Sequence, residues 1–380
     1  MSKLNLIVAD TDVSYLKGVV GYIADKYSGR FKVSSFSDSS SLKDYIGGNN
    51  GKADILLVSP ELYYEGLGEK GITLVAVLSA GRLPGEYKKC EVINKFQLGD
   101  NLVGNILNLF SEKNTDILMQ NGEKSAKIIA VYSPTGGSGK TSVAYGCSLK
   151  CAQKGQKVFY LNLEDTPSTP LFFESKGKYN LSHIFYYLKA KNKNLSLKIE
   201  GTRMEDASSG IHYFIPPVSR LELLDMQPQE YSSLLKQLRQ MDYYDVVFVD
   251  MPCFLEKRMI SVLEESDSVI FLLTPDMVSD VKLAGALEEF DILYNNENID
   301  ILSKILFVMN KSNIDNMPDI DCLKAREREI SFIIPKIPQL ISMQSGRAYM
   351  ELNSPFGWML EQIISGCWYR KLGEEPFGEG

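Results

Sequence analysis

Short apolar runs alternate with amphipathic or polar stretches along most of the chain, and this alternation decides the expected fold. The first third contains five apolar runs that predict buried strands, at residues 4–8, 31–36, 54–58, 74–78 and 91–93. Apolar positions at helical spacing follow the first run, at residues 13–27. Short strands separated by crossover segments are typical of a parallel sheet with helices on both faces.

The same pattern resumes beyond a polar, turn-rich stretch at residues 111–126. Helices are predicted at residues 221–241 and 279–294, and further buried strands at residues 128–131, 158–163, 244–250, 268–273 and 305–311. Residues 211–218 predict a strand that leads into a loop. We therefore expect an α/β protein with two doubly wound domains. We expect a first domain at residues 1–110, a linker at 111–126, a second domain at 127–372 and an acidic tail at 373–380.

One stretch of the second region, residues 127–149, combines a strand, a glycine-rich turn and a helix start. Its sequence is KIIAVYSPTGGSGKTSVAYGCSL, and helical spacing begins at the Lys-Thr pair. This order of elements is the context that a phosphate-binding loop requires. The candidate ligand-binding residues of the loop are Thr135, Gly136, Gly137, Ser138, Gly139, Lys140, Thr141 and Ser142.

The residue types in this loop suit a phosphate. Glycines let backbone N–H groups turn inward, and a helix N-terminus adds positive potential. Lys140 would bring an ammonium group to the β- and γ-phosphates, and Thr141 would bring a hydroxyl to Mg²⁺. The strict pattern has glycine five residues before Gly139, where this chain has Pro134. The alternative interpretation is an ordinary strand–helix turn that is rich in glycine.

A second motif, YDVVFVDMP at residues 244–252, places four apolar residues directly before Asp250. In P-loop proteins a carboxylate at the end of such a strand orients Mg²⁺-bound water beside the γ-phosphate. Buried strands that end in Asp are also common in α/β proteins without this role. Together with the glycine loop, the motif favours Asp250 as a catalytic residue and a magnesium ligand.

Composition narrows the classes of protein that fit. Hydrophobic residues make up 44% and charged residues 23% of the 380 residues, as in soluble globular proteins. A net charge of -7 argues against sequence-independent DNA binding, which needs a basic face. The six cysteines show no CxxC spacing, which argues against a zinc ribbon or a disulfide framework. Without a signal-peptide pattern or a membrane-length apolar run, the expectation is a soluble cytoplasmic protein.

These motifs together resemble the MinD/ParA group of deviant Walker ATPases. The match rests on SPTGGSGKTS, YDVVFVDMP, SVIFLLTP, FVMNK and the proline-containing IIPKIPQL. The resemblance implies ATP and Mg²⁺ as cofactors and a second catalytic residue, Glu164, where the family has Asp-x-Asp after a strand. It also implies that Asn310 binds the adenine edge and that the loop with Pro335 and Pro338 flanks the base.

Structural interpretations stay open for two of these residues, since Glu164 also suits a solvated strand end and Asn310 a strand-end turn. Two departures from the family bear on hydrolysis. The family's loop carries a Lys that crosses a dimer interface, where this chain has Thr135, and the first Asp of Asp-x-Asp is Asn162. Loss of a comparable cation, an arginine finger, costs on the order of 10³–10⁵ in rate. We therefore expect ATP binding with slow or absent hydrolysis.

The first region resembles a response-regulator receiver domain, which has a flavodoxin-like fold. Asp10 and Asp12 match the acidic pair after strand one, Ser79 matches the hydroxyl after strand four, and Lys95 matches the lysine after strand five. The phosphoacceptor position holds Ser59, which cannot form the acyl phosphate. We expect an atypical receiver kept for protein contacts, with Asp10 and Asp12 as strand-end and helix-capping residues.

An atypical receiver joined to a MinD/ParA-like domain resembles the TadZ/CpaE proteins of tight-adherence (Flp) pilus assembly. This resemblance implies a homodimeric localisation and assembly factor for pilus or secretion proteins, without direct DNA binding. The implied location is the cytoplasm, at a pole or peripheral to the inner face of the membrane. The amphipathic segment 356–372 is expected to pack on the ATPase-like core, with membrane contact as the alternative. The alternative functions are an active partitioning-type ATPase and a response-regulator-like signalling protein.

Overall fold

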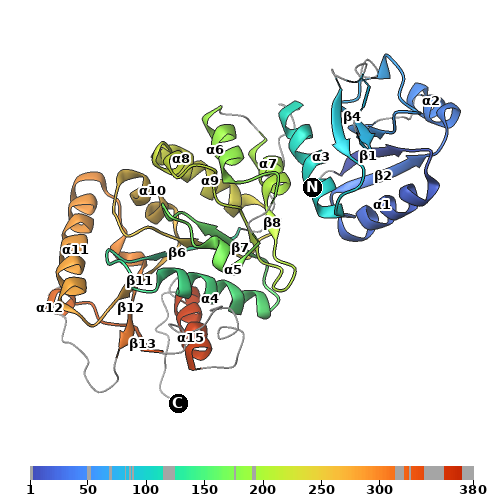
Figure 1. Cartoon of the computed structure of the whole chain (residues 1–380). Coiled ribbons are helices and arrows are strands. Elements are labelled where there is room, and N and C mark those ends of the chain that lie inside the picture. The colour runs from blue at the N-terminus through green and yellow to red at the C-terminus, as the bar shows by residue number, and fades with distance from the viewer. Residues whose placement is uncertain are drawn as a thin grey trace. The chain divides into compact units, whose positions relative to one another are not determined.

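The computed structural model divides the chain into two compact units, each with its own sheet (Figure 1). One unit combines Met1–Gln120 with Ala190–Thr202, and the other combines Asn121–Lys189 with Arg203–Gly380. The structure describes residues 3–48, 53–67, 71–81, 83–84, 87, 90–113, 125–174, 177–190, 194–312, 321–324, 327–337 and 355–369.

The first unit contains a five-stranded sheet in the order β2-β1-β3-β4-β5, in which all neighbouring strands are parallel. This is the flavodoxin-like order of doubly wound sheets. The five strands predicted from the apolar runs are confirmed to within one residue at each end. In chain order the elements are β1 (Leu4–Ala9), α1 (Val13–Lys26), β2 (Phe31–Phe36), α2 (Ser39–Gly47), β3 (Ile55–Val58), β4 (Leu74–Ser79), β5 (Glu91–Asn94), α3 (Gly99–Lys113) and α7 (Leu195–Thr202).

Successive strand residues point to opposite faces of this sheet, and each face has its own apolar core. On one face the helices α1 and α3 pack against β1, as in the contact of Leu6 with the cluster that contains Leu102. On the other face α2 covers the sheet, and Ile7 belongs to the same cluster as Leu42. The first unit is therefore a three-layer α/β sandwich.

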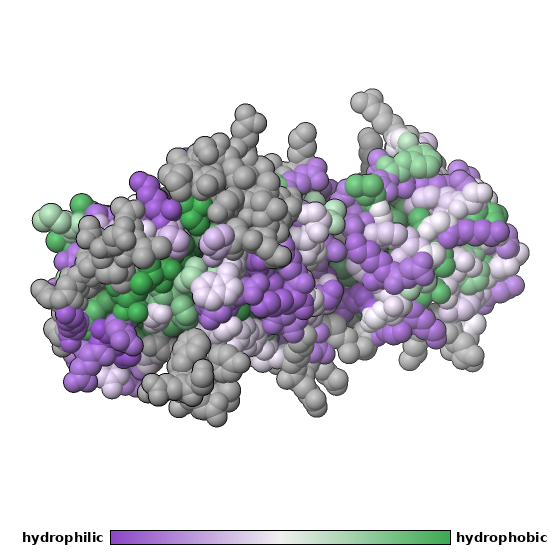
Figure 2. All heavy atoms as spheres, turned by 90° about the horizontal axis from the view of Figure 1, so that it is seen from below, coloured by the Kyte–Doolittle hydropathy of each residue, from purple (hydrophilic) through white to green (hydrophobic). Residues whose placement is uncertain are grey.

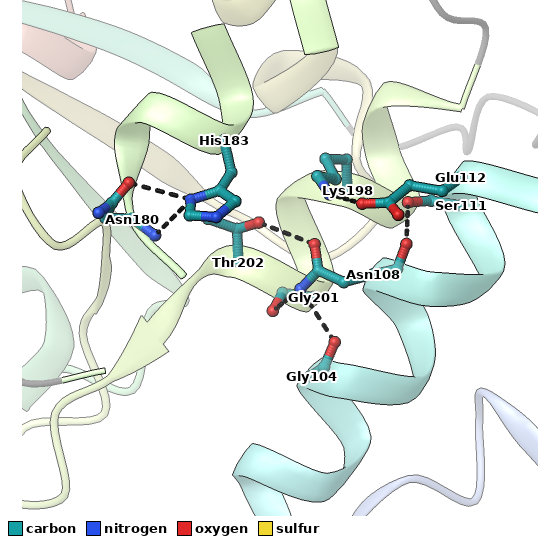
Figure 3. Close-up of polar contacts among 9 residues, drawn as sticks. All are labelled: Gly104, Asn108, Ser111, Glu112, Asn180, His183, Lys198, Gly201 and Thr202. Carbon is teal, nitrogen blue, oxygen red and sulfur yellow. Dashed lines mark hydrogen bonds and ion pairs between the residues drawn. The ribbon is translucent and has the colours of Figure 1, made fainter. Parts of the chain in front are cut away.

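The helix α7 reaches this unit from a distant part of the sequence and packs on α3, as Figure 3 shows. Leu197 is fully buried in the core that α1 and α3 share. The buried Asn108 donates from its amide nitrogen to the carbonyls of Gly104 and Gly201. Its amide oxygen accepts from the hydroxyl of Thr202 at 3.2 Å. Glycine on both helices lets their backbones approach at this point.

The observed units differ from the expected boundaries in two places. α3 continues to Lys113, into the expected linker, and residues 190–202 group with the first unit instead of the second. The reason is that α3 has buried residues on more than one side, so a second element has to cover it. Lys198 strengthens the contact through an ion pair of 2.7 Å with Glu112.

The second unit contains an eight-stranded sheet in the order β13-β12-β11-β6-β10-β7-β9-β8. Its neighbouring strands are parallel except for the antiparallel pair β8 and β9. In chain order the elements are β6 (Lys127–Tyr132), α4 (Lys140–Gln153), β7 (Val158–Asn162), α5 (Thr169–Phe172), α6 (Leu181–Lys189), β8 (Met204–Glu205), β9 (His212–Tyr213), α8 (Leu221–Leu224), α9 (Pro228–Gln240), β10 (Val246–Asp250), α10 (Lys257–Glu265), β11 (Ser268–Leu273), α11 (Met277–Glu297), the 3₁₀ helix η3 (Leu302–Lys304), β12 (Ile305–Ser312), α12 (Asp321–Lys324), β13 (Phe332–Pro335) and α15 (Pro355–Tyr369).

The helices α4 and α15 lie side by side on one face of this sheet (Figure 1). Phe356, Leu360 and Ile363 of α15 are buried in the cluster that also holds the apolar residues of α4. This confirms that the C-terminal amphipathic segment packs on the core of its unit. Among the described side chains of α15, Trp358 alone is a large apolar residue with strong exposure, 61%.

Proline explains how two segments of the second unit are divided. The helix predicted at 221–241 is two helices, α8 and α9, because Pro228 begins the second and has no N–H to continue the first. In the segment 211–218, predicted as a strand that leads into a loop, the strand is β9, and Pro216 and Pro217 lie in the loop because proline cannot donate to a sheet.

No helix in the described ranges is both long and apolar enough to cross a membrane. The view from below in Figure 2 shows apolar side chains in groups between hydrophilic ones. The apolar face of α15 is used in the core, so this helix presents no broad apolar stripe among its described side chains.

Candidate functional site

The residues that the sequence motifs single out in the second unit converge at the carboxyl ends of neighbouring parallel strands. β6 leads into the glycine loop, and β10 beside it ends at Asp250. β7 follows on the other side of β10, and its last residue, Asn162, is in register with Asp250. This edge is where doubly wound α/β proteins bind their ligands.

The loop between β6 and α4 has the backbone of an anion-binding turn. Gly137 and Gly139 have φ angles of 71° and 94°, in the left-handed region that favours glycine. Gly139 is the N-cap of α4, and no side chain in the described ranges caps the N–H groups of the helix's first turn. These groups remain directed toward the loop, where an anion would satisfy them.

Three buried polar atoms at this edge have no hydrogen-bond partner among the described residues. They are the hydroxyl oxygens of Thr135 and Ser138 and the Oδ1 atom of Asp250. Lys140, at the start of α4, is also buried, with 7% of its surface exposed. Buried polar atoms in proteins are normally paired, so this group of unpaired atoms points to a ligand or ion at the loop.

Asp250 is the most buried carboxylate of the site, and its Oδ2 atom accepts from the phenol of Tyr160 at 2.8 Å. Burial and the nearby charge of Glu164 raise the pKa of Asp250 to about 7. The hydrogen bond from Tyr160, together with Thr141 and Lys140 from the first turn of α4, acts in the opposite direction and lowers this pKa. A cation at the free oxygen of Asp250 would therefore stabilise the ionised form of this carboxylate.

Glu164 lies two residues beyond Asn162 and belongs to the same polar cluster. Its carboxylate accepts from the hydroxyl of Ser168 at 2.7 Å and from the amide of Asn162 at 3.4 Å. The Asn162 amide also lies 3.4 Å from Oδ2 of Asp250. The structure thus brings the two predicted catalytic residues, Glu164 and Asp250, to either side of one neutral asparagine. The catalytic role of Glu164 stays a prediction.

The described residues expected around the base lie on strands that are two and three places away from β6 in the sheet. Asn310, in β12, is buried and donates from its amide nitrogen to the carbonyl of Ser138 at 2.7 Å. Pro335 ends β13, in register with Ser312. Pro338 lies outside the described residues. Adenine binding by Asn310 and flanking of the base by the two prolines stay predictions.

Three further residues of the site were not predicted from the sequence, although one of them, Lys311, lies in the FVMNK motif. Tyr160 holds Asp250, Lys311 donates to the carbonyl of Gly137 at 2.6 Å, and Lys282 of α11 donates to the carbonyl of Pro134 at 3.2 Å. A signal for Tyr160 was present, because it lies two residues before Asn162 and so on the same face of β7. Lys282 lies far from the motifs in the sequence, and no sequence pattern indicated that it would reach the glycine loop.

The residues of the first unit that were matched to receiver positions in the sequence also lie at one sheet edge, following β1, β3, β4 and β5. The ammonium of Lys95 lies 2.8 Å from Asp10 and 3.7 Å from Asp12. Asp12 caps α1 by accepting two backbone N–H groups, which confirms its capping role. The hydroxyl of Ser59 is buried without a partner in the described ranges, and Ser79 bonds to the backbone of Gly81.

Comparison with known proteins bears mainly on the second unit. The sequence model of the AAA domain family matches residues 126–303. A ParA family ATPase from Chlorobium tepidum has 16% identity, covers 63% of this chain and 97% of its own, and has a TM-score of 0.53. MinD from Aquifex aeolicus has 17% identity, covers 67% and 100%, and has a TM-score of 0.51. The second unit has the MinD/ParA fold.

Among curated proteins, no sequence matches this chain. The similarity of the MinD/ParA-like unit to known proteins therefore consists of its match to the AAA domain family model and of its fold, which it shares with solved structures at low sequence identity. At this level of identity the fold is shared, and the chemistry depends on the residues at the glycine loop.

Proposed function

We propose that the MinD/ParA-like unit binds ATP together with Mg²⁺ and holds it with slow or absent hydrolysis. The observation that carries this proposal is the arrangement at the ends of β6 and β10. Lys140 and Thr141 open α4 beside Asp250, whose Oδ1 atom has no partner among the described residues. A P-loop lysine binds phosphate oxygens, and hydroxyl and carboxylate oxygens are ligands that suit Mg²⁺.

The residues present fit magnesium ATP. The orphaned oxygen of Asp250 and the uncapped start of α4 offer an acceptor for the cation and donors for the phosphates. Tyr160 fixes the other carboxylate oxygen of Asp250, so the free oxygen has one orientation. When bound, the metal would neutralise phosphate charge, which is its usual contribution in P-loop proteins.

Slow hydrolysis follows from two side chains. Thr135 takes the place of a cation that reaches across a dimer in the resembling family, and its short side chain is 9% exposed within its own loop. Asn162 is neutral where that family has a carboxylate. Glu164 keeps a negative charge nearby, but its carboxylate is hydrogen-bonded to Ser168. The site thus keeps the groups that bind a nucleotide and lacks a charge that turnover would use.

We also propose a homodimer with its contact beside the nucleotide. The first turns of α11 expose the apolar residues Met277, Val278 and Val281, by 84%, 59% and 71%. Lys282 of the same helix donates to the carbonyl of Pro134, so these residues border the glycine loop. Apolar residues gathered in this way favour a protein contact.

The wider role that we propose is a nucleotide-dependent localisation and assembly factor for a tight-adherence pilus or a related secretion system, in the cytoplasm. It rests on the resemblance of the two-unit chain to TadZ/CpaE proteins. Phosphorelay through the receiver-like unit is disfavoured, since Ser59 replaces the acceptor aspartate and cannot form the acyl phosphate. Partitioning by DNA binding is disfavoured by the net charge of -7.

Single-turnover phosphate release from ATP and Mg²⁺ tests this proposal. We expect bound ATP to stay largely intact in the wild type, and Lys140→Ala to lose the nucleotide. Lys154→Ala, at the exposed far end of α4, is the matched control and should bind like the wild type. Thr135→Lys should raise the release rate if the missing cation limits it. Robust Mg²⁺-dependent release that Lys140→Ala abolishes would refute slow hydrolysis.

A further inference from the structure

We infer that Asn310 and Lys311 form a clamp that holds the glycine loop in its phosphate-binding form before the nucleotide arrives. This inference rests on the proposed binding of ATP and assigns both residues a positioning role. In this role they act on the loop backbone and need not touch the base. The role differs from adenine recognition, which the resemblance implied for Asn310.

The clamp joins two consecutive side chains to two consecutive carbonyls. The amide nitrogen of Asn310 donates to the carbonyl of Ser138 at 2.7 Å, in a buried position. The ammonium of Lys311 donates to the carbonyl of Gly137 at 2.6 Å, in an exposed position. β11 lies between β12 and β6 in the sheet. The clamp therefore joins the end of β12 to the loop that follows β6, a strand with which β12 does not pair.

The direction of these carbonyls sets the direction of the donors that a phosphate would use. In a planar trans peptide the C=O and the N–H of the next residue point opposite ways. Holding the carbonyls of Gly137 and Ser138 toward β12 therefore turns the N–H groups of Ser138 and Gly139 away from β12. A loop whose N–H groups are already directed loses less conformational freedom when an anion binds.

A backbone irregularity makes the clamp possible. In a regular strand, consecutive side chains point to opposite faces, so Asn310 and Lys311 would not reach the same loop. The pairing of β12 with β13 passes from Asn310 directly to Ser312, which leaves Lys311 as a bulge residue. Lys311 has φ 59°, in the left-handed region that a non-glycine residue rarely adopts. A bulge of this kind re-aims side chains, often at functional sites.

Both the nitrogen and the oxygen of the Asn310 amide already have hydrogen-bond partners. Its oxygen accepts from the N–H of Lys311 at 2.9 Å, which supports the left-handed turn. Its nitrogen lies where a Cβ on residue 139 would come within 2.4 Å, so a side chain at that position would displace the Asn310 amide from Ser138, and the φ of 94° favours glycine independently. For Asn310 to bind adenine, its amide would have to release Ser138 or share a hydrogen bond.

The test is to measure the affinity of the full chain for Mg²⁺ complexes of ATP, GTP and inorganic tripolyphosphate. Asn310→Ala should weaken ATP and tripolyphosphate binding by the same factor, about ten-fold, and leave the ATP-to-GTP ratio unchanged. Lys311→Ala should act in the same direction by a smaller factor, because its bond is exposed. Lys311→Arg should recover most of the loss. Lys304→Ala is the matched control, since Lys304 donates to the carbonyl of Glu264 before the start of β12.

Two results would overturn the clamp. Unchanged tripolyphosphate binding with a lost preference for ATP over GTP in Asn310→Ala would assign Asn310 to the base. Unchanged binding of every ligand in both Asn310→Ala and Lys311→Ala would show that the loop keeps its form without them. Failure of the wild type to bind any of the three would instead overturn the proposed nucleotide function itself.

Discussion

Gly201 offers the sharpest test of the packing of α7 on α3. A Cβ added at Gly201 would lie 2.9 Å from the backbone nitrogen of Asn108 and 2.7 Å from its amide nitrogen. Real Cβ contacts are essentially never this short, and a backbone atom within a helix cannot move cheaply. Gly201→Ala therefore either separates the two helices or displaces the Asn108 amide from its bonds to Gly104, Gly201 and Thr202.

The two routes set the size of the effect. Overpacking in a well-packed core costs about 1–3 kcal/mol. Each lost hydrogen bond costs about 1 kcal/mol, and more where a buried carbonyl is left unpaired. We expect Gly201→Ala to destabilise the first unit by about 2–4 kcal/mol. Gly18→Ala, in α1, is the matched control, because its Cβ would meet nothing within 4 Å. Alanine there should stabilise the helix by about 0.5–1 kcal/mol.

Hydrogen exchange measured by mass spectrometry on peptides from α3 (Gly99–Lys113) is the assay, because it reports the opening of this helix in the full chain. Gly201→Ala should speed exchange throughout α3, whereas Gly18→Ala should leave it unchanged or slower. If Gly201→Ala leaves exchange in α3 at the wild-type rate, α7 is not a required part of the first unit.

Three further predictions concern single contacts. Tyr160→Phe removes the donor to Asp250 and should weaken Mg²⁺-dependent ATP binding about ten-fold while leaving Mg²⁺-free binding unchanged; equal loss in both conditions would contradict this. Lys95→Met leaves the buried Asp10 without its cation and should cost about 3 kcal/mol in urea unfolding. Asp10→Asn added to Lys95→Met should recover most of that loss, and no recovery would argue against the pair. A chain ending at residue 354 lacks α15 and should lose cooperative unfolding of the MinD/ParA-like unit, measured by circular dichroism; an unchanged transition would show that α15 is dispensable.

Apolar runs located the strands well because a buried parallel strand requires them. The five strands of the first unit and the strand before the glycine loop were predictable to within a residue or so, since nothing else explains such short runs. Asp250 was placed by the same logic, as the first polar residue after a buried strand. The edge at which the site forms therefore follows from the sequence.

What could not be predicted depends on contacts between distant parts of the chain. The sequence of residues 195–202 does not indicate that they cover α3. A short helix that buries Leu197 has the same sequence pattern whether it packs on the core of the first unit or on that of the second. The bulge at Lys311 arises from pairing with β13 and has no local signal. In contrast, the break between α8 and α9 has a local signal, Pro228, which the single helix predicted at 221–241 did not take into account.

Isothermal titration calorimetry of the full chain with ATP, with and without Mg²⁺, directly tests whether the glycine loop binds ATP. We predict saturable binding of one ATP per chain that is tighter with Mg²⁺. Lys140→Ala should weaken this binding by at least about ten-fold, and Lys154→Ala should not change it. Absence of ATP binding in the wild type, or equal binding in Lys140→Ala, would show that the glycine loop does not bind ATP through Lys140.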